Sequence, residues 1–431
     1  MQKRIIIVFA ILSILTIIAY ALILNPTIQE KIGWRINAWM IRLRTWINPP
    51  EQVAFSADGE VAPAPDTLPT PNVENEQDNT PPDDITPEAT MPFDAIPDVF
   101  ELEPPTYFSQ HYRWNYCGPA NIAMLMSYWG WSGSHDQAAQ TLKPYKLDKN
   151  VMPYEMANLV AQEMPDMRTL IRVGGEFETL KRLIANGFPV LVEKGPQFRD
   201  IHYHWTWMGH YQVLTGYNDQ EGYFIAQDSY IEANYKQPYE ELLGEWRSFN
   251  YLYIVAFPDE ERNDVLNLLG DDADEEQNYR NALQKAQDEI YQVDGVERFF
   301  ALYNYGTNLV NLRDYEGAAK AYDQAFAVYD ALPEDITIRP YRILWYQTGP
   351  YYAYYYTGRY VNVIKLATDN AIKMVRDDEP ALEESYYWRG AAKIALGIRE
   401  TAIEDFQTCL TYHPGFQPCL DALNEQGIFP D

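Results

Sequence analysis

Hydrophobic and polar positions divide the chain into segments of different kinds. Residues 5–24 carry no charge and are nearly all apolar, which is long enough to cross a bilayer as a helix. Residues 25–48 place an apolar stripe at helical spacing, with tryptophan and arginine suited to a membrane interface. Residues 49–98 are rich in proline and acidic residues and too poor in large apolar side chains to offset the entropy of ordering. We expect this segment to be a disordered linker.

Two interpretations of the apolar N-terminal segment compete. A signal peptide would be cleaved after the small residues at 19–21. An uncleaved anchor fits the full twenty-residue length better, and we favour it. Lys3 and Arg4 place residues 1–4 in the cytoplasm, although basic residues after the span favour the opposite orientation. We expect a single-pass membrane protein whose remaining domains lie outside the cytoplasm.

The C-terminal part repeats small and aromatic residues. Gly306 is followed after twelve residues by an alanine and after four more by an aromatic residue, and the same spacing begins again at Gly390. A degenerate copy lies between them. This pattern resembles the tetratricopeptide repeat, which implies an all-α solenoid over residues 275–429 that binds a protein partner. The acidic residues 259–274 before it are typical of a linker.

A candidate nucleophile lies in the middle of the chain. Apolar residues at helical spacing between Pro119 and Gly130 predict a helix that begins near Cys117. The dipole and free N–H groups of a helix N-terminus favour an anion, which lowers the pKa of a thiol there. Gln110 lies one loop upstream, where its amide can stabilise an oxyanion.

A thiolate nucleophile needs a base, and the base needs a group that orients it. Residues 210–228 read as strand, turn and strand. If the loop is 218–221, His210 faces Ser229, and a loop one residue shorter places it opposite Asp228. Either register brings the imidazole and the carboxylate to the same end of one hairpin.

These segments resemble the C39-like cysteine peptidases, a family with a papain-like fold. The similarity rests on four segments in the same order, which are Gln110 with Cys117-Gly118-Pro119-Ala120, residues 152–157, residues 177–192 and residues 209–228. It covers about residues 104–257 and implies an α+β peptidase domain over residues 99–258.

The resemblance also implies roles for four residues. Cys117 matches the nucleophile, His210 the base, Asp228 the residue that orients the base and Gln110 the oxyanion donor. Gln110 stands seven residues before Cys117, where a papain-like enzyme leads us to expect about six.

Aromatic residues crowd into residues 197–209, directly before His210. One interpretation is a wall that selects the substrate, with Trp205, Trp207 and Gly209 as binding residues. The other is a loop that packs its aromatics on the domain, and the sequence favours neither. His202 and His204 with His210 suggest a metal site, but no acid or cysteine completes it at a set spacing. We expect no metal and no cofactor.

Charge and cysteine content narrow the function further. The formal net charge of −29 makes nucleic acid an unsuitable partner. Of the three cysteines, Cys409 and Cys419 fall on neighbouring predicted helices and either form a disulfide or stay reduced and buried. In both cases Cys117 has no other cysteine with which to form a disulfide.

Together these features predict a membrane-anchored cysteine peptidase that acts on peptide or protein substrates through an acyl-enzyme. A catalytically idle scaffold is the first alternative, although such a domain would be free to lose one of the three catalytic residues. An acyltransferase or amidase that uses the same triad is the second, and the sequence cannot separate it from a peptidase.

Overall fold

The computed structural model describes residues 96–111, 115–145, 150–199, 205–335, 337–372 and 382–429. The expected cytoplasmic, membrane and juxtamembrane segments lie outside these residues, as does the expected linker up to residue 95. Within the described part of the chain, no helix has both the length and the apolar character needed to cross a bilayer.

One antiparallel sheet organises residues 99–258. Its strands are β1 (Val99–Glu101), β2 (Met167–Arg172), β3 (Val190–Lys194), β6 (His210–Asn218), β7 (Tyr223–Gln227), β8 (Tyr235–Pro238) and β9 (Tyr253–Pro258). They lie in the order β2-β9-β3-β6-β7-β8, and β1 also pairs with β6. Strands β4 (Gln197–Arg199) and β5 (Trp205–Trp207) form a separate pair.

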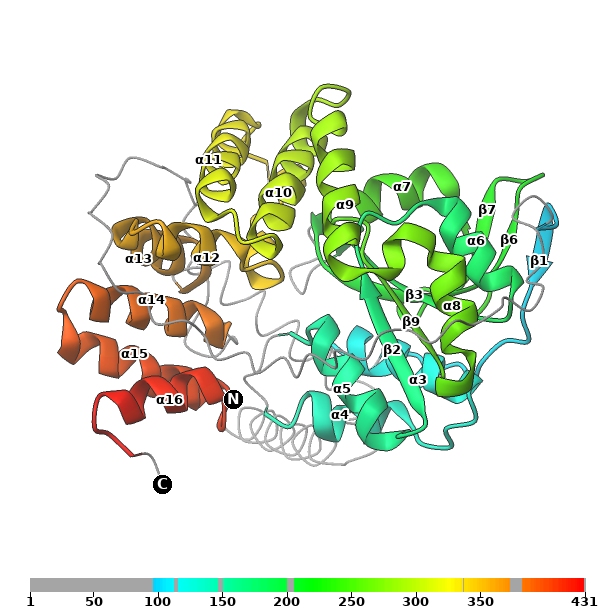
Figure 1. The fold of residues 1–431 in the computed structure, drawn as a ribbon, viewed down its shortest axis with the longest axis horizontal. Coiled ribbons are helices and arrows are strands. Elements are labelled where there is room, and N and C mark those ends of the chain that lie inside the picture. The colour runs from blue at the N-terminus through cyan, green and yellow to red at the C-terminus, as the bar shows by residue number, and fades with distance from the viewer. Residues whose placement is uncertain are drawn as a thin grey trace, which may run out of the picture.

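Helices cover both faces of the sheet (Figure 1). Successive strand residues point to opposite faces, so Leu191 and Val213 enter one core while their neighbours Val190 and Leu214 enter the other. The first core is closed by α3 (Cys117–Tyr128), α4 (His135–Leu142) and α5 (Pro153–Glu163), and the second by α6 (Phe177–Ala185), α7 (Tyr239–Arg247) and α8 (Arg262–Leu269). The domain is α+β, as expected.

Residues 259–274, which we expected to be a linker, are folded. They form η1 (Asp259–Glu261), α8 and η2 (Gly270–Ala273). Val265 and Leu269, one helical turn apart, are buried in the core with α6, while Asp264 is exposed. The linker prediction is wrong because the acidic residues of this segment cover the outside of an amphipathic helix.

The C-terminal region is helical and follows an arc beside the sheet (Figure 1). Its elements are α9 (Glu275–Glu289), α10 (Gly295–Asn311), α11 (Tyr315–Ala331), η3 (Ile343–Trp345), α12 (Gly349–Tyr356), α13 (Tyr360–Leu366), η4 (Ala367–Ile372), α14 (Glu383–Ala395), α15 (Arg399–Tyr412) and α16 (Gln417–Glu425). A helix begins at Glu275, where the sequence predicts the helical region to start, and α16 lies near the C-terminus.

Two helix pairs in this region share one packing detail. A methyl group on Gly306 of α10 would lie 2.9 Å from the ring of Tyr322 on α11. A methyl group on Gly390 of α14 would lie 2.5 Å from the ring of Phe406 on α15. Glycine therefore allows the aromatic ring of the second helix to lie against the first, at equivalent positions of both pairs.

The sheet domain and the helical region share a buried contact surface. Trp207 stacks on Phe249 of the sheet domain and lies against Phe300 of α10, with ring centroids 5.4 and 5.8 Å away. Next to them, the Asn250 amide donates a hydrogen bond of 2.7 Å to the Asn308 amide oxygen. Aromatic packing and paired buried amides hold the two parts together.

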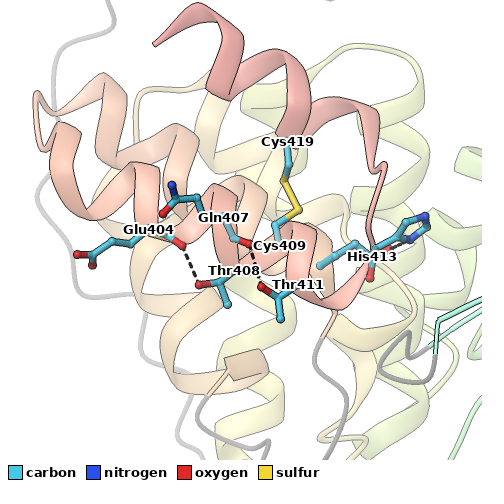
Figure 2. The surroundings of a disulfide bond; sticks show 8 residues. Glu404, Gln407, Thr408, Cys409, Thr411, His413 and Cys419 are labelled. Atoms are coloured by element: carbon cyan, nitrogen blue, oxygen red, sulfur yellow. Dashed lines mark hydrogen bonds and ion pairs between the residues drawn. A yellow bond between two sulfur atoms is a disulfide. The ribbon is translucent and has the colours of Figure 1, made fainter. Parts of the chain in front are cut away.

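A disulfide fastens the C-terminal helices. Cys409 on α15 and Cys419 on α16 are bonded, and both are buried (Figure 2). The sequence left a disulfide and two reduced thiols as alternatives, and the structure has the disulfide. Cys117 is the free cysteine.

Candidate active site

Cys117 is the first residue of α3, as the sequence predicts. Asn115 takes a left-handed φ of 58° just before it, and Ala120 to Met126 anchor the helix in the core. The thiol is partly exposed, and its sulfur accepts hydrogen bonds from the backbone N–H groups of Gly118 and Tyr211. The fold thus presents the sulfur at a helix N-terminus with two N–H groups directed at it.

His210 is the first residue of β6 and lies between Cys117 and Asp228. Its Nε2 donates a hydrogen bond of 2.8 Å to Asp228 Oδ1, and the other ring nitrogen is left for the hydrogen bond with the Cys117 thiol. Asp228 follows the last residue of β7 and is fully buried. The structure therefore brings the three residues into one hydrogen-bonded chain.

The hairpin register differs from both sequence alternatives. Asn218 pairs with Tyr223, so the loop is residues 219–222, and a β-bulge between Leu214 and Gly216 shifts the pairing by one residue. His210 and Asp228 are consequently not opposite each other. The carboxylate reaches the imidazole because the chain turns after β7, where Asp228 Oδ1 also accepts the N–H groups of Tyr230 and Ile231 at 2.9 and 3.0 Å.

Electrostatics favour a thiolate–imidazolium pair. Burial acts to raise the pKa of Cys117, but the hydrogen bond and charge of His210 outweigh it and leave the pKa below its usual value. Burial acts to lower the pKa of His210, but Asp228 and Cys117 raise it to about 9. Asp228 has a pKa of about 2, because the contact with His210 and the charge of Lys194 outweigh the effect of burial.

Gln110 is connected to helix α3 through the side chains of Ser229 and Asn121. Its side-chain oxygen accepts a hydrogen bond of 2.6 Å from the Ser229 hydroxyl. Asn121 on α3 donates to the Ser229 hydroxyl at 2.8 Å and to the Cys117 carbonyl at 2.9 Å. Since Ser229 holds the oxygen end of the Gln110 amide, the N–H₂ end is the one that can donate to a bound substrate.

Lys194, which the sequence did not identify as a candidate, lies next to Asp228. It is the cross-strand partner of His210 and is buried. Its ammonium group lies 2.6 Å from Gln237 Oε1, 3.0 Å from Glu245 Oε2 and 3.8 Å from Asp228 Oδ2. A lysine at the end of an apolar strand carries no signal in the sequence, because only the fold shows which carboxylates surround it.

Replacing Lys194 by methionine should raise the pKa of His210 above its value of about 9. The variant removes a positive charge next to Asp228, whose negative charge then acts more fully on the imidazolium. The NMR titration of the His210 ring measures this shift. Loss of one partner from a buried ionic cluster should also lower the free energy of unfolding by about 3 kcal/mol.

Lys181→Met is the matched control for this variant, because Lys181 is a buried lysine paired with Asp219 at 2.7 Å on another part of the domain. It should destabilise the protein without moving the His210 titration. An unchanged pKa in Lys194→Met would show that Lys194 has no electrostatic effect on the triad.

The aromatic residues before His210 differ in their burial and in their contacts. Phe198 lies edge-on to the His210 ring at 5.1 Å and stacks on Tyr230 at 4.3 Å. Trp205 is exposed, and Gly209 directly precedes the imidazole. Trp207 is only 2 % exposed and packs between the two domains, so the prediction that it binds substrate is wrong for this residue. Trp205 and Trp207 are two residues apart on β5 and therefore share a face of that strand. The difference in their burial comes from the contact of Trp207 with the helical region.

No group of three or more His, Cys, Asp or Glu residues in the described ranges is arranged to hold a metal ion. His202 and His204, which we weighed as ligands with His210, lie outside those ranges. The His210 ring nitrogens are instead engaged by Asp228 and Cys117.

The sheet domain is similar to known proteins. Residues 104–254 match the sequence model of the Peptidase_C39 like family. A solved structure from Bacillus anthracis, described as a C39-like peptidase, is 18% identical over 37% of this chain and 97% of that chain, with a TM-score of 0.30. No curated protein sequence matches the chain.

Proposed function

We propose that this chain, whose residues 104–254 match a family of C39-like peptidases, is a cysteine hydrolase that cleaves peptides through an acyl-enzyme. The observation that carries the proposal is the hydrogen-bonded chain from Cys117 through His210 to Asp228. A buried carboxylate, a raised imidazole pKa and a lowered thiol pKa are the properties that nucleophilic catalysis by cysteine requires.

The proposed reaction has two steps. The Cys117 thiolate attacks the peptide carbonyl, and the His210 imidazolium gives its proton to the leaving amine as the C–N bond breaks. Water then attacks the thioester, His210 accepts its proton, and the carboxylic acid leaves from Cys117. Asp228 stabilises the imidazolium and holds Nε2–H throughout. The Gln110 amide donates to the oxyanion in both steps.

The remaining parts of the chain suit recruitment and attachment. We infer that the helical region is a tetratricopeptide-type module that binds a protein partner, because its helix pairs repeat the glycine–aromatic packing of Gly306 with Tyr322 and of Gly390 with Phe406. The uncharged residues 5–24 would anchor the enzyme in a membrane, with the catalytic domain outside the cytoplasm.

Hydrolysis of p-nitrophenyl acetate by the full-length chain tests the proposed chemistry. We expect a burst of nitrophenolate close to one per chain, an acetyl thioester on Cys117 seen by mass spectrometry, and slower turnover. Cys117→Ser is the matched control and should show no burst. Absence of both burst and thioester in the wild-type chain would contradict the enzyme proposal and favour a scaffold.

Two additions to the same experiment separate the reaction classes. Glycinamide added during turnover would appear in the product if the enzyme is an acyltransferase, whereas a hydrolase releases acetate. A peptide library from a digested proteome, incubated with the wild-type chain and with Cys117→Ser, shows by new N-termini whether peptide bonds are cleaved.

A further inference from the structure

The connection between α11 and α12 lies against the peptidase domain beside the candidate active site. Arg342 donates a hydrogen bond of 3.2 Å to the Thr206 hydroxyl, and Gln347 donates one of 2.6 Å to the Ser248 carbonyl. Between them, the carbonyl of Trp345 accepts a hydrogen bond from Asn150. The connection is thus held at three points by residues of the sheet domain.

Tyr346 is the residue of this connection that reaches the site. Its hydroxyl oxygen accepts a hydrogen bond from the backbone N–H of Gly209, the residue before His210. A methyl group on Gly209 would lie 2.6 Å from Tyr346 Cε1, so the lack of a side chain at Gly209 allows the ring to lie there. The rings of Trp207 and Phe249 pack edge-to-face with the Tyr346 ring, both with centroids 5.6 Å away.

Contacts around His210 connect the Tyr346 ring to the sulfur. Tyr346, Gly209 and Cys117 are each partly exposed, whereas His210 beside them is buried. The Tyr346 ring lies against Gly209, Gly209 is bonded to His210, and the His210 ring in turn contacts the Cys117 thiol. A peptide bound at the thiol would therefore lie near this aromatic ring, which is suited to apolar side chains.

We propose that Tyr346, which the helical region supplies, is a specificity residue of the peptidase site that packs on an apolar side chain of the peptide substrate and positions the Gly209–His210 backbone. The proposal rests on the proposed function. It means that the helical region completes the substrate site and does more than recruit a partner.

Alkylation of Cys117 in the full-length chain with two electrophiles tests this. Iodoacetamide reaches the thiol with almost no contact to neighbouring residues, whereas a peptidyl epoxide with leucine next to the reactive group occupies the substrate site. Tyr346→Ala should slow the leucyl epoxide at least tenfold and iodoacetamide less than threefold. Tyr346→Phe keeps the ring but removes the hydrogen-bond acceptor for Gly209, so it should retain most of the preference for the leucyl reagent.

Two controls make the outcome decisive. Tyr341→Phe makes the same change elsewhere on the connection and should leave both rates unchanged. An epoxide with aspartate in place of leucine should react at similar rates with the wild type and Tyr346→Ala, because the ring offers no partner for a carboxylate.

The failures are distinguishable. Equal rates of the leucyl epoxide with the wild type and Tyr346→Ala would overturn the role of Tyr346, and so would an equal loss with both electrophiles that follows the loss of thermal stability. If iodoacetamide labels wild-type Cys117 no faster than a free thiol, the proposed function itself fails.

Discussion

Alkylation of Cys117 by iodoacetamide at pH 6 should slow by at least about tenfold when His210 is replaced by alanine. The imidazolium lowers the pKa of the thiol, so at this pH a larger fraction of the wild-type sulfur is ionised than of an unpaired thiol. Without His210, burial again favours the neutral thiol. Rates measured from pH 4 to 10, with the adduct located by mass spectrometry, give the thiol pKa of each variant.

The direction of the pH dependence follows from the two shifts. In the wild type, alkylation should rise as the pH passes the lowered pKa of Cys117 and then stay high. Hydrolysis should rise with it but fall again above a pH of about 9, where His210 loses the proton that the leaving amine needs. The alanine variant should alkylate only as the pH reaches or passes about 8.5, the usual pKa of a thiol, because burial favours the neutral form. His135→Ala is the control, and equal rates in all three proteins would exclude a thiolate–imidazolium pair.

Replacing Asp228 by asparagine should reduce hydrolysis at pH 8 by at least about thirtyfold. Asparagine keeps an oxygen for the N–H groups that Asp228 Oδ1 accepts, but it removes the negative charge. The pKa of His210, now about 9, should then fall below about 6.5, because burial of the imidazole is no longer offset by the carboxylate. The alkaline limb of the pH–rate profile measures the fall directly.

Asp219→Asn provides the matched control, since Asp219 lies on the loop of the same hairpin and pairs with Lys181 outside the triad. It should leave the alkaline limb in place. A profile for Asp228→Asn that keeps its limb near pH 9 would mean that the carboxylate does not stabilise the imidazolium.

Local sequence patterns predicted the elements of the site but not their exact alignment. The helix at Cys117 and the hairpin at His210 follow from apolar spacing and turn residues, which act over a few positions. The β-bulge near Leu214 depends on how β6 packs between β3, β1 and β7, and no local signal marks it. The triad still forms, because the turn after β7 carries Asp228 back toward the imidazole.

Contacts between distant segments account for the rest. Trp207 was a candidate for substrate binding because it lies near His210 in the sequence, but helix α10 packs against it. Lys194 and Tyr346 come near His210 only through strand pairing and through the contact between the two domains. At residues 259–274 the acidic composition suggested a linker. Val265 and Leu269, which hold α8 in the core, were not recognised in the sequence.

The disulfide between Cys409 and Cys419 gives the protein a practical property. Of three cysteines, two are consumed in a buried bond at the far end of the chain, so the native protein offers one thiol to reagents. A saturating label under non-reducing conditions therefore counts intact Cys117 thiols, one per molecule. The fraction of molecules with an intact Cys117 can be measured before a substrate is known, and the rate of the proposed reaction can be expressed per intact thiol.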